Sequence, residues 1–403
     1  MKNWPTVSLG EITSGGQYGL NAAAMSEGTG VRFVRITDIT QAGELRHEEP
    51  AFVAEGTPEL ASYELTDGDV LIARSGATAG KSYVHRCFGE RAVFAGYLIR
   101  FQPDVSKVLP GFIGAFLKTP DYWQQLNSRK RAVAQPNVNA KQLASLVLPL
   151  PPLEEQERIV KLLDEADELQ KLRGQADRRT DALIPALFHE MFGQHIAAPP
   201  IVTSTAGLRT PRGWRWAQLT EVGRLATGHT PSRQHPEWWG GDIPWISLTD
   251  IRELDGTIAM ATSEYVNEKG IANSSAVKLP KDTVCFSRTA SVGFVTVMGR
   301  EMATSQDFVN WVCGPELDPF FLMAALMQAR EHLRSLASGS THKTIYFPTV
   351  KEFATILPPI ALQREFAARA TEIRALRMEQ SASQHRLVDL FKSLLNRAFN
   401  GEL

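Results

Sequence analysis

The hydrophobic and polar positions of this chain follow the same pattern twice. Short apolar runs divided by Gly, Pro, Asn and Asp come first, which predicts strands joined by tight turns. A longer stretch follows, in which apolar or small residues recur at spacings of three and four, as in a helix that packs on another helix. These residues are Leu162, Ala166, Leu169, Leu172, Ala176, Leu183 and Leu187 in the first copy and Phe366, Ala370, Ile373, Leu376, Leu387, Leu390, Leu394 and Ala398 in the second.

Start and stop signals bound the first of these helices. We expect it to begin at Leu153, directly after a pair of prolines, with two glutamates in its first turn. Gly193 lies beyond its end. Pro185 is expected to kink or break the helix near its last turns, because proline has no N–H to donate.

Matching segments show that the two halves are copies of one another. Residues 35–39 (RITDI) return as 247–251 (SLTDI), and residues 65–74 (LTDGDVLIAR) return as 279–288 (LPKDTVCFSR). The offset stays near 210 residues along the whole chain. A duplication of this length predicts pseudo-two-fold symmetry, which suits a target that is itself bipartite.

Together these patterns predict an α+β protein. Two mixed α/β domains alternate with two long helices that pack as an antiparallel coiled coil. We expect the first domain at 1–150, its helical region at 151–193, a surface linker at 194–212, the second domain at 213–357 and its helical region at 358–403. Inside the domains we expect strands at 70–73, 97–101 and 308–312 and helical stretches at 111–126 and 320–336.

Composition narrows the function classes. The chain has 43 basic and 44 acidic residues, a formal charge of −1, which excludes a wholly basic surface but not local basic patches. Its three cysteines form no CxxC pair, so we expect reduced thiols in a cytoplasmic protein. We see no charged-then-apolar leader and no apolar run of 18 residues, and therefore expect neither secretion nor membrane insertion.

One segment resembles a phosphate-binding loop. Residues 76–82 read Gly-Ala-Thr-Ala-Gly-Lys-Ser, with three residues between the glycines where the motif needs four. The second copy has no Gly-Lys-Ser at the equivalent place. His229 and His235 lack a cysteine or carboxylate at metal-ligand spacing. We therefore predict neither a metal site nor a catalytic centre, and nucleotide hydrolysis by residues 76–82 stays open as an alternative.

Polar, Gly-rich loops recur at equivalent places in the two copies. Arg and Lys suit phosphates and guanine edges, Asn and Gln suit adenine, and small hydroxyl residues suit either. We predict that these loops bind DNA. The candidate residues are Gln17, Tyr18, Arg74, Ser75, Thr78, Lys81, Arg129, Lys130, Arg131, Asn137 and Asn139 in the first copy and Thr230, Ser232, Arg233, Arg288, Ser291, Gln306, Ser340, Thr341, His342 and Lys343 in the second.

The chain resembles the specificity subunit of type I restriction–modification systems over essentially its whole length. Each motif is short, and their order, repeated twice, makes the resemblance specific. The segments that carry it are 148–156 (LPLPPLEEQ), 356–359 (ILPP) with Gln363, 243–247 (IPWIS) with Asp250-Ile251, and 339–344 (GSTHKT), supported by 227–232 (TGHTPS). The first copy departs from this pattern, with Ser-Gly-Gly-Gln-Tyr at 14–18 where the second has its Thr-Pro-Ser loop.

The resemblance implies a non-catalytic reader of double-stranded DNA. Each recognition domain would contact one half of a split sequence, and the helices would fix the unread spacer. Two methyltransferase subunits would dock on the helical regions and, in systems that cleave DNA, two restriction subunits would join them. S-adenosylmethionine, ATP and Mg²⁺ would then bind to those partners, and no cofactor to this chain. A scaffold that binds only proteins is the other alternative, and salt-dependent binding to duplex DNA separates the two.

Overall fold

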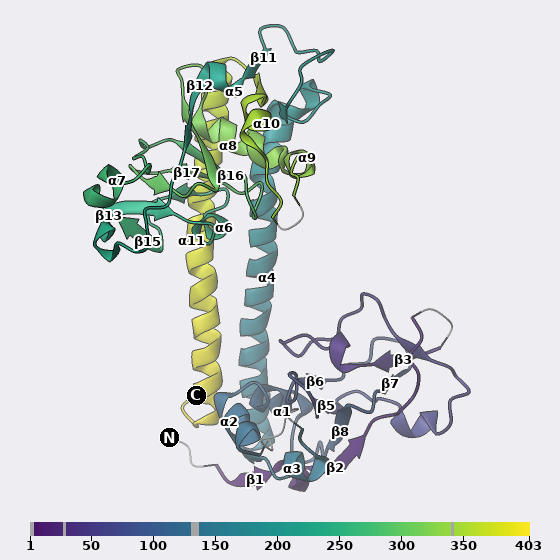
Figure 1. The fold of residues 1–403 in the computed structure, drawn as a ribbon. Coiled ribbons are helices and arrows are strands. Elements are labelled where there is room, and N and C mark those ends of the chain that lie inside the picture. Colours follow the sequence, from purple (N-terminus) through teal and green to yellow (C-terminus); the bar gives the residue numbers. More distant parts are fainter. Residues whose placement is uncertain (1–3, 27–29, 130–136, 340–341) are drawn as a thin grey trace. The chain divides into compact units, whose positions relative to one another are not determined.

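The computed structural model describes residues 4–26, 30–129, 137–339 and 342–403. The chain divides into two compact units, the first formed by residues 1–173 with 383–403 and the second by 174–382. Helix α4 (Leu153–Met191) begins in the first unit and ends in the second, and α11 (Ile360–Phe399) runs back from the second to the first. Each unit therefore contains one strand-rich domain and a part of each long helix (Figure 1).

The first unit is built on a four-stranded antiparallel sheet, in the order β2-β8-β5-β6. The same unit contains a three-stranded sheet, in the order β4-β3-β7, and a two-stranded sheet in which β1 pairs with β9. The strands are β1 (Thr6–Ser8), β2 (Thr13–Tyr18), β3 (Val31–Val34), β4 (Phe52–Val53), β5 (Val70–Ala73), β6 (Ser82–Val84), β7 (Ala92–Phe94), β8 (Leu98–Pro103) and β9 (Val147–Pro149). The short helices are η1 (Leu9–Glu11), η2 (Ile36–Asp38), η3 (Leu60–Tyr63), α1 (Pro110–Phe116), α2 (Pro120–Arg129) and α3 (Ala140–Ala144).

The second unit repeats this plan, with a five-stranded sheet in the order β12-β19-β16-β17-β14. Its smaller sheets are β15-β13-β18 and β10-β20-β11. The strands are β10 (Ile201–Val202), β11 (Arg215–Gln218), β12 (Gly223–Thr227), β13 (Trp239–Ile246), β14 (Ile258–Ala259), β15 (Glu264–Val266), β16 (Val284–Ser287), β17 (Val295–Met298), β18 (Ala303–Thr304), β19 (Phe308–Cys313) and β20 (Ala354–Leu357). The short helices are η4 (Gly193–His195), which precedes β10, and α5 (Leu219–Val222), η5 (Pro236–Trp238), α6 (Asp250–Glu253), α7 (Glu268–Ala272), α8 (Pro319–Gln328), α9 (Arg330–Ser335) and α10 (Phe347–Lys351).

The two units share one topology, and this confirms the predicted internal repeat. The order β2-β8-β5-β6 corresponds to β12-β19-β16-β17, and β3 runs parallel to β7 as β13 does to β18. The repeated Thr-Asp-Ile segments also have the same local role. Asp38 accepts a hydrogen bond from the Arg35 N–H at 2.9 Å, and Asp250 accepts one from the Ser247 N–H at 2.9 Å.

The long helices pack on the domains and, within each unit, on one another. In the second unit the ring centres of Phe188 on α4 and Phe366 on α11 are 5.6 Å apart. The Asp181 carboxylate of α4 also forms an ion pair with Arg377 of α11 at 2.7 Å. Residue numbers therefore rise along one helix as they fall along the other, which makes the pair antiparallel. In the first unit Leu163 and Leu395 belong to one buried cluster. The predicted antiparallel helix pair is thus confirmed within each unit (Figure 1).

The predicted apolar stripes are only partly correct. Phe366, Ala370, Ala166 and Ala398 are buried, because they face the sheets or helices of their own domain. Five predicted members are at least 44% exposed: Leu169, Leu172, Leu183, Leu376 and Leu390. The core instead takes Ile159, Leu163 and Phe188 from α4, Phe192 directly after its end, and Leu395 from α11. The helix faces turned to the domains are buried, and spacing alone did not identify those faces.

Two further expectations need correction. Helix α4 continues through Pro185 to Met191, so the predicted break there is wrong. A proline inside a helix removes one N–H donor, and Pro185 lies on an exposed face where water can solvate the carbonyl left over. The segment 194–212 is not only a surface linker. Ile201 and Val202 are buried and form β10, which pairs with β20.

A buried glutamine fixes the start of each long helix. Gln156 is fully buried, and its amide donates to the carbonyls of Lys107 (3.0 Å) and Pro151 (2.9 Å) while its Oε1 accepts from the Leu109 N–H (2.9 Å). Gln363 makes the same three bonds in the second unit, to Glu316, Pro358 and Asp318, at 3.0, 2.7 and 2.9 Å. Each glutamine therefore ties the first turn of a long helix to the segment that leads into the helices of its domain.

We expect Gln156→Ala and Gln363→Ala each to lower the free energy of unfolding by about 2 kcal/mol, because each leaves buried backbone groups without partners. Thermal unfolding of the full chain measures this change. Gln175→Ala is the matched control, since Gln175 is exposed on the same helix α4 and its loss should change stability by less than about 0.5 kcal/mol. Equal effects at Gln156 and Gln175 would show that the buried amide has no anchoring role.

Candidate nucleic-acid interface

Arg74 and Arg288 occupy the same place in their units. Each follows the last residue of a central strand, β5 or β16. The Arg74 N–H donates to the Tyr97 carbonyl at 2.9 Å, and the Arg74 carbonyl accepts from the Val138 N–H at 2.9 Å. The Arg288 N–H donates to the Asp307 carbonyl at 2.9 Å, and its carbonyl accepts from the Ile345 N–H at 2.8 Å. The backbone of both arginines is thus held on both sides.

Each of these arginines also lies over an aromatic ring. The guanidinium carbon of Arg74 is 4.8 Å from the centre of the Tyr18 ring on β2, and that of Arg288 is 4.7 Å from the Phe347 ring on α10. Burial lowers the pKa of the Arg288 guanidinium, and the nearby Asp307 opposes that shift. Arginine stays charged across the physiological range. Both side chains are half-buried and keep some surface toward solvent.

The loops that follow the two arginines have matching neighbours. Ser75 forms an antiparallel bridge with Asn137, and Thr289 forms one with Thr344. The next residue is left-handed in both units, with φ +75° at Gly76 and φ 58° at Ala290. Asn137 and Thr344, from two segments that the sequence singles out separately, therefore pair with the arginine loops.

The structure brings many of the predicted residues together in each unit. In the first unit Arg74 lies over Tyr18, whose hydroxyl accepts from the N–H of Ala140 at 3.2 Å, and the exposed Asn137 pairs with Ser75. In the second unit Arg288 donates to the Gln306 carbonyl at 2.9 Å.

Gln306 also connects Arg288 to the Thr-Pro-Ser loop of the second unit. The Thr230 hydroxyl donates to Oε1 of Gln306 at 2.7 Å. His342 and Lys343 are exposed, and the Lys343 carbonyl accepts from the Ala290 N–H at 2.9 Å. These residues make a polar, basic surface around Arg288.

Other candidates use their side chains inside the chain. Ser291 is buried, and its hydroxyl accepts from Arg252, so its assignment to the surface is wrong. Arg129 donates to Ser145 and to the Gln125 carbonyl, and Gln17 bonds to Arg100 and the Ser62 carbonyl. These side chains support the domain and offer few free donors.

Two more candidates have structural partners of a different kind. Asn139 caps helix α3, where its side-chain oxygen accepts from the Gln142 N–H at 2.8 Å. Arg233 pairs with Glu264 at 2.7 Å and lies 3.7 Å from the Trp239 ring centre, and this pairing raises its pKa. Thr78 is half-buried and Ser232 is exposed. Lys130, Arg131, Ser340 and Thr341 lie outside the described residues.

The segment 76–82 does not have the geometry of a phosphate-binding loop. It joins two antiparallel strands, β5 and β6, and no helix starts after it. The N–H groups of Ala79, Gly80 and Lys81 donate to carbonyls of the chain itself. The Lys81 ammonium donates to the Ile39 carbonyl at 2.7 Å, and burial, together with the charge of Arg46, lowers its pKa. A bound phosphate needs these donors free, so the geometry disfavours the hydrolase alternative.

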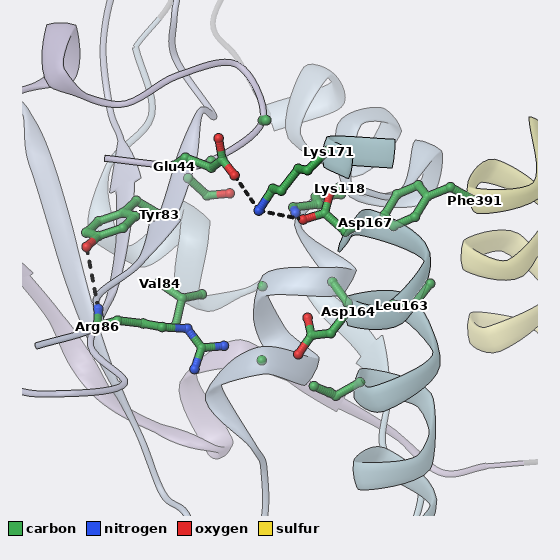
Figure 2. Close-up of a pocket in the computed structure, with 17 residues that line it drawn as sticks. Glu44, Tyr83, Val84, Arg86, Lys118, Leu163, Asp164, Asp167, Lys171 and Phe391 are labelled. Atoms are coloured by element: carbon green, nitrogen blue, oxygen red, sulfur yellow. Dashed lines mark hydrogen bonds and ion pairs between the residues drawn. The ribbon is translucent and has the colours of Figure 1, made fainter. Parts of the chain in front are cut away.

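A cavity of about 200 Å³ lies between the first domain and α4, within the first unit (Figure 2). The Lys171 ammonium pairs there with Glu44 at 2.6 Å and with Asp167 at 3.0 Å. These two bonds raise the pKa of Lys171. Because Glu44 belongs to a loop of the domain, the ion pairs tie that loop to α4. Cations and carboxylates alternate around the cavity and largely neutralise one another, so it is a poor fit for a strongly charged ligand.

Two exposed tyrosines beside the arginine loops escape the sequence analysis. Tyr97, 67% exposed, holds the Arg74 N–H through its carbonyl, and Tyr346, 56% exposed, follows directly after Ile345. Pairing of these segments with the arginine loops is not visible in a single sequence. Tyr97 directly precedes Leu98-Ile99, and Tyr346 lies between Ile345 and Phe347, so no signal in the sequence marks either tyrosine as exposed.

The described residues show neither of two other kinds of site. No group of three or more His, Cys, Asp and Glu side chains among them is arranged to hold a metal ion. Every helix in this part of the chain is too short or too polar to span a bilayer.

Comparisons with known proteins match this architecture along the whole chain. The family model of the type I restriction modification DNA specificity domain matches residues 1–176 and 211–379. The specificity subunit of the type I restriction enzyme HindI from Haemophilus influenzae is 22% identical over 470 residues, which cover 100% of both chains. The putative MjaX specificity subunit from Methanocaldococcus jannaschii is 22% identical over 415 residues, covering 100% of this chain and 94% of the relative.

Solved structures show the same fold. A chain from a study of complex assembly and conformational transition in a type I R-M system has a TM-score of 0.63 at 19% identity, covering 100% of this chain and 99% of its own. The S subunit of a type I restriction-modification system from M. genitalium has a TM-score of 0.61 at 13% identity, covering 98% and 96%.

We expect Lys81→Met to lower the free energy of unfolding by about 1 kcal/mol, because it removes the donor to the Ile39 carbonyl. Thermal unfolding measures this loss. Phosphate release from ATP should be at background for both the wild-type chain and the variant. Hydrolysis by the wild-type chain that the variant lacks would revive the hydrolase alternative.

Proposed function

Because the chain belongs to the type I restriction modification DNA specificity family, we propose that it reads a split site in double-stranded DNA, one half with each unit. The observation that carries this proposal is the repeated arginine loop. Arg74 and Arg288 follow equivalent strands, have their backbone held in the same way and lie over aromatic rings. A duplicated polar surface on a duplicated fold suits two short stretches of one duplex.

The residues around each arginine would divide the work of DNA binding. Exposed Lys343 and His342 are suited to phosphates, which position a protein on the duplex. Exposed Asn137 and Gln306 carry amides, which suit adenine edges. The chain itself would do no chemistry and would act as the reader for a methyltransferase.

Two methyltransferase subunits would dock on the helical regions and, in a system that cleaves DNA, two restriction subunits would join them. Apolar side chains left at the surface of the helices support a protein partner there. Leu169 and Leu172 are 52% and 50% exposed, and Met378 is 76% exposed. S-adenosylmethionine, ATP and Mg²⁺ would bind to those partners, and the assembly would work in the cytoplasm, where its DNA target lies.

We expect the chain, expressed with its methyltransferase, to direct adenine methylation to one sequence made of two defined parts with an unread spacer between them. Sequencing of modified bases across the genome of the expressing cell measures this. Expression of the methyltransferase alone is the control and should leave no such motif. A motif of one continuous block would contradict reading by two units.

Binding to duplex DNA by the full chain should weaken steeply as salt rises, because each phosphate contact releases counterions. Fluorescence anisotropy with a labelled duplex carrying the mapped site measures this slope. Affinity that does not change with salt, or no binding at all, would favour the scaffold alternative.

We further propose that α4 and α11 set the number of unread base pairs. Removing seven residues, about two turns, from the middle of both helices preserves their facing sides and shortens each by about 10 Å. Since one base pair rises about 3.4 Å, the spacer should lose about three base pairs. Mapping of methylated sites measures the new spacing. Wild-type spacing in a folded double-deletion variant would show that the helices are not the ruler.

A further inference from the structure

We infer that Arg74 and Arg288 each read a guanine, so that each half of the recognised site contains a guanine at an equivalent position. This inference rests on the proposed function, and it assigns to one residue of each unit a base that neither the family nor the fold specifies. Three features carry it: the backbone of each arginine is held on both sides, an aromatic ring lies against its guanidinium, and a left-handed residue follows two positions later.

The backbone at both arginines is held on both sides of the residue. Hydrogen bonds of 2.8 to 2.9 Å connect each arginine to the strand-end segment before β8 or β19 and to the segment near 138 or 345. The bridges Ser75–Asn137 and Thr289–Thr344 extend this pairing by one residue. A side chain that starts from a fixed Cα can be aimed at one base edge, which a flexible loop does not allow.

The aromatic ring restricts each guanidinium, whose carbon lies 4.8 Å from the ring centre at Arg74 and 4.7 Å at Arg288. An arginine held by such a cation–π contact has lost part of its side-chain freedom before it binds, so less is lost on binding. The flat pair of acceptors on guanine, O6 and N7, gains more from a restricted guanidinium than a phosphate does, because a phosphate accepts hydrogen bonds over a wide range of directions. The rings come from different elements, Tyr18 on β2 and Phe347 on α10, yet produce the same arrangement.

The end of each guanidinium is the part that remains available. The Nε atoms of Arg74 and Arg288 are buried and have no hydrogen-bond partner within the described residues. Arg288 also donates through Nη2 to the Gln306 carbonyl at 2.9 Å, which leaves it further N–H groups on Nη1 and Nη2. The two terminal nitrogens of a guanidinium match the paired acceptors of guanine in a bidentate contact. Separate exposed cations nearby, such as Lys343, can serve the phosphates.

The loop after each arginine has a left-handed residue at the same position in both units, although that residue is a glycine in only one of them. Gly76 adopts φ +75° without cost, but Ala290 adopts φ 58°, a region that an L-residue with a Cβ disfavours. The Ala290 N–H donates to the Lys343 carbonyl at 2.9 Å, which holds this conformation. The same turn is therefore maintained two residues after both arginines, as a shared recognition geometry requires.

The test selects bound sequences from a pool of random-sequence DNA duplexes with the full chain and its variants. The wild-type chain should select a bipartite motif with a guanine in each half. Arg288→Gln should reduce the preference for guanine roughly tenfold at one position of one half, and Arg74→Gln should do the same in the other half. Arg86→Gln and Arg300→Gln, at exposed arginines away from these loops, are matched controls and should leave the motif unchanged.

Variants of the two aromatic rings separate the orientation of each arginine side chain from its charge. Phe347→Leu and Tyr18→Leu retain each arginine but remove its platform, and should broaden the choice at the same position as the arginine variants. Tyr18→Phe keeps the ring and should keep the guanine. Thermal unfolding of every variant checks that it is folded, and Arg→Met variants at 74 and 288, which keep a long side chain but no donor, replace any Gln variant that is not.

The outcomes are distinct. If folded variants select the wild-type motif with uniformly weaker binding, the arginines contact phosphates and the inference is wrong. A wild-type motif without guanine in one half also overturns it, although the chain would still be a reader of split DNA sites. If the wild-type chain selects no motif from the pool, the proposed function itself fails.

Discussion

The buried amides of Gln156 and Gln363 are the constraint on which the rest of the structure depends. Each side-chain amide lies in the first turn of a long helix and makes three hydrogen bonds with backbone groups. Every long helix must leave its domain in a fixed direction if two domains are to be held for a single target. A fully buried amide with all its partners in place defines such a direction, because any other orientation leaves polar groups unsatisfied away from water. Because the same three bonds are present in both units, α4 and α11 begin in the same way relative to their own domains.

Beneath the shared topology the interiors of the two sheets differ. Arg100 on β8 is buried in the first unit and pairs with Asp69 at 3.2 Å, while it also donates to carbonyls near residues 62–64. The equivalent place on β19 holds Asn310, which donates to the Thr304 hydroxyl at 3.0 Å. Removing one partner of a buried ion pair costs several kcal/mol, so such a network changes only as a whole. The strand order is fixed by apolar residues and is the same with the buried Arg100–Asp69 ion pair as with the Asn310–Thr304 hydrogen bond. The surrounding loops are therefore free to diverge.

The sequence predicts the architecture well, because a duplicated pattern offers each element twice. Strand β5 and the start of α4 lie where the pattern places them, and the antiparallel helix pair is present in each unit. The stripe assignments at Leu169 and Leu376 fail, because spacing shows that a helix has apolar residues but not which face meets a domain. Strand β10 is missed because only two of its residues pair. At the candidate interface, residue type identifies Arg74 and Arg288. It cannot show that Lys81 and Arg129 have partners inside the fold, since those partners are backbone carbonyls.

The last part of α11 belongs to the first unit, although it follows the second unit in the sequence, and this has a consequence for synthesis of the protein. Leu395 and Ala398, near the end of α11, belong to the buried cluster that contains Ile12 and Phe112 of the first unit. A ribosome synthesises these residues only after the whole second unit. The domain that emerges first therefore cannot complete its core until the end of α11 has been made, so premature termination within the final turns of this helix leaves the first domain without part of its core.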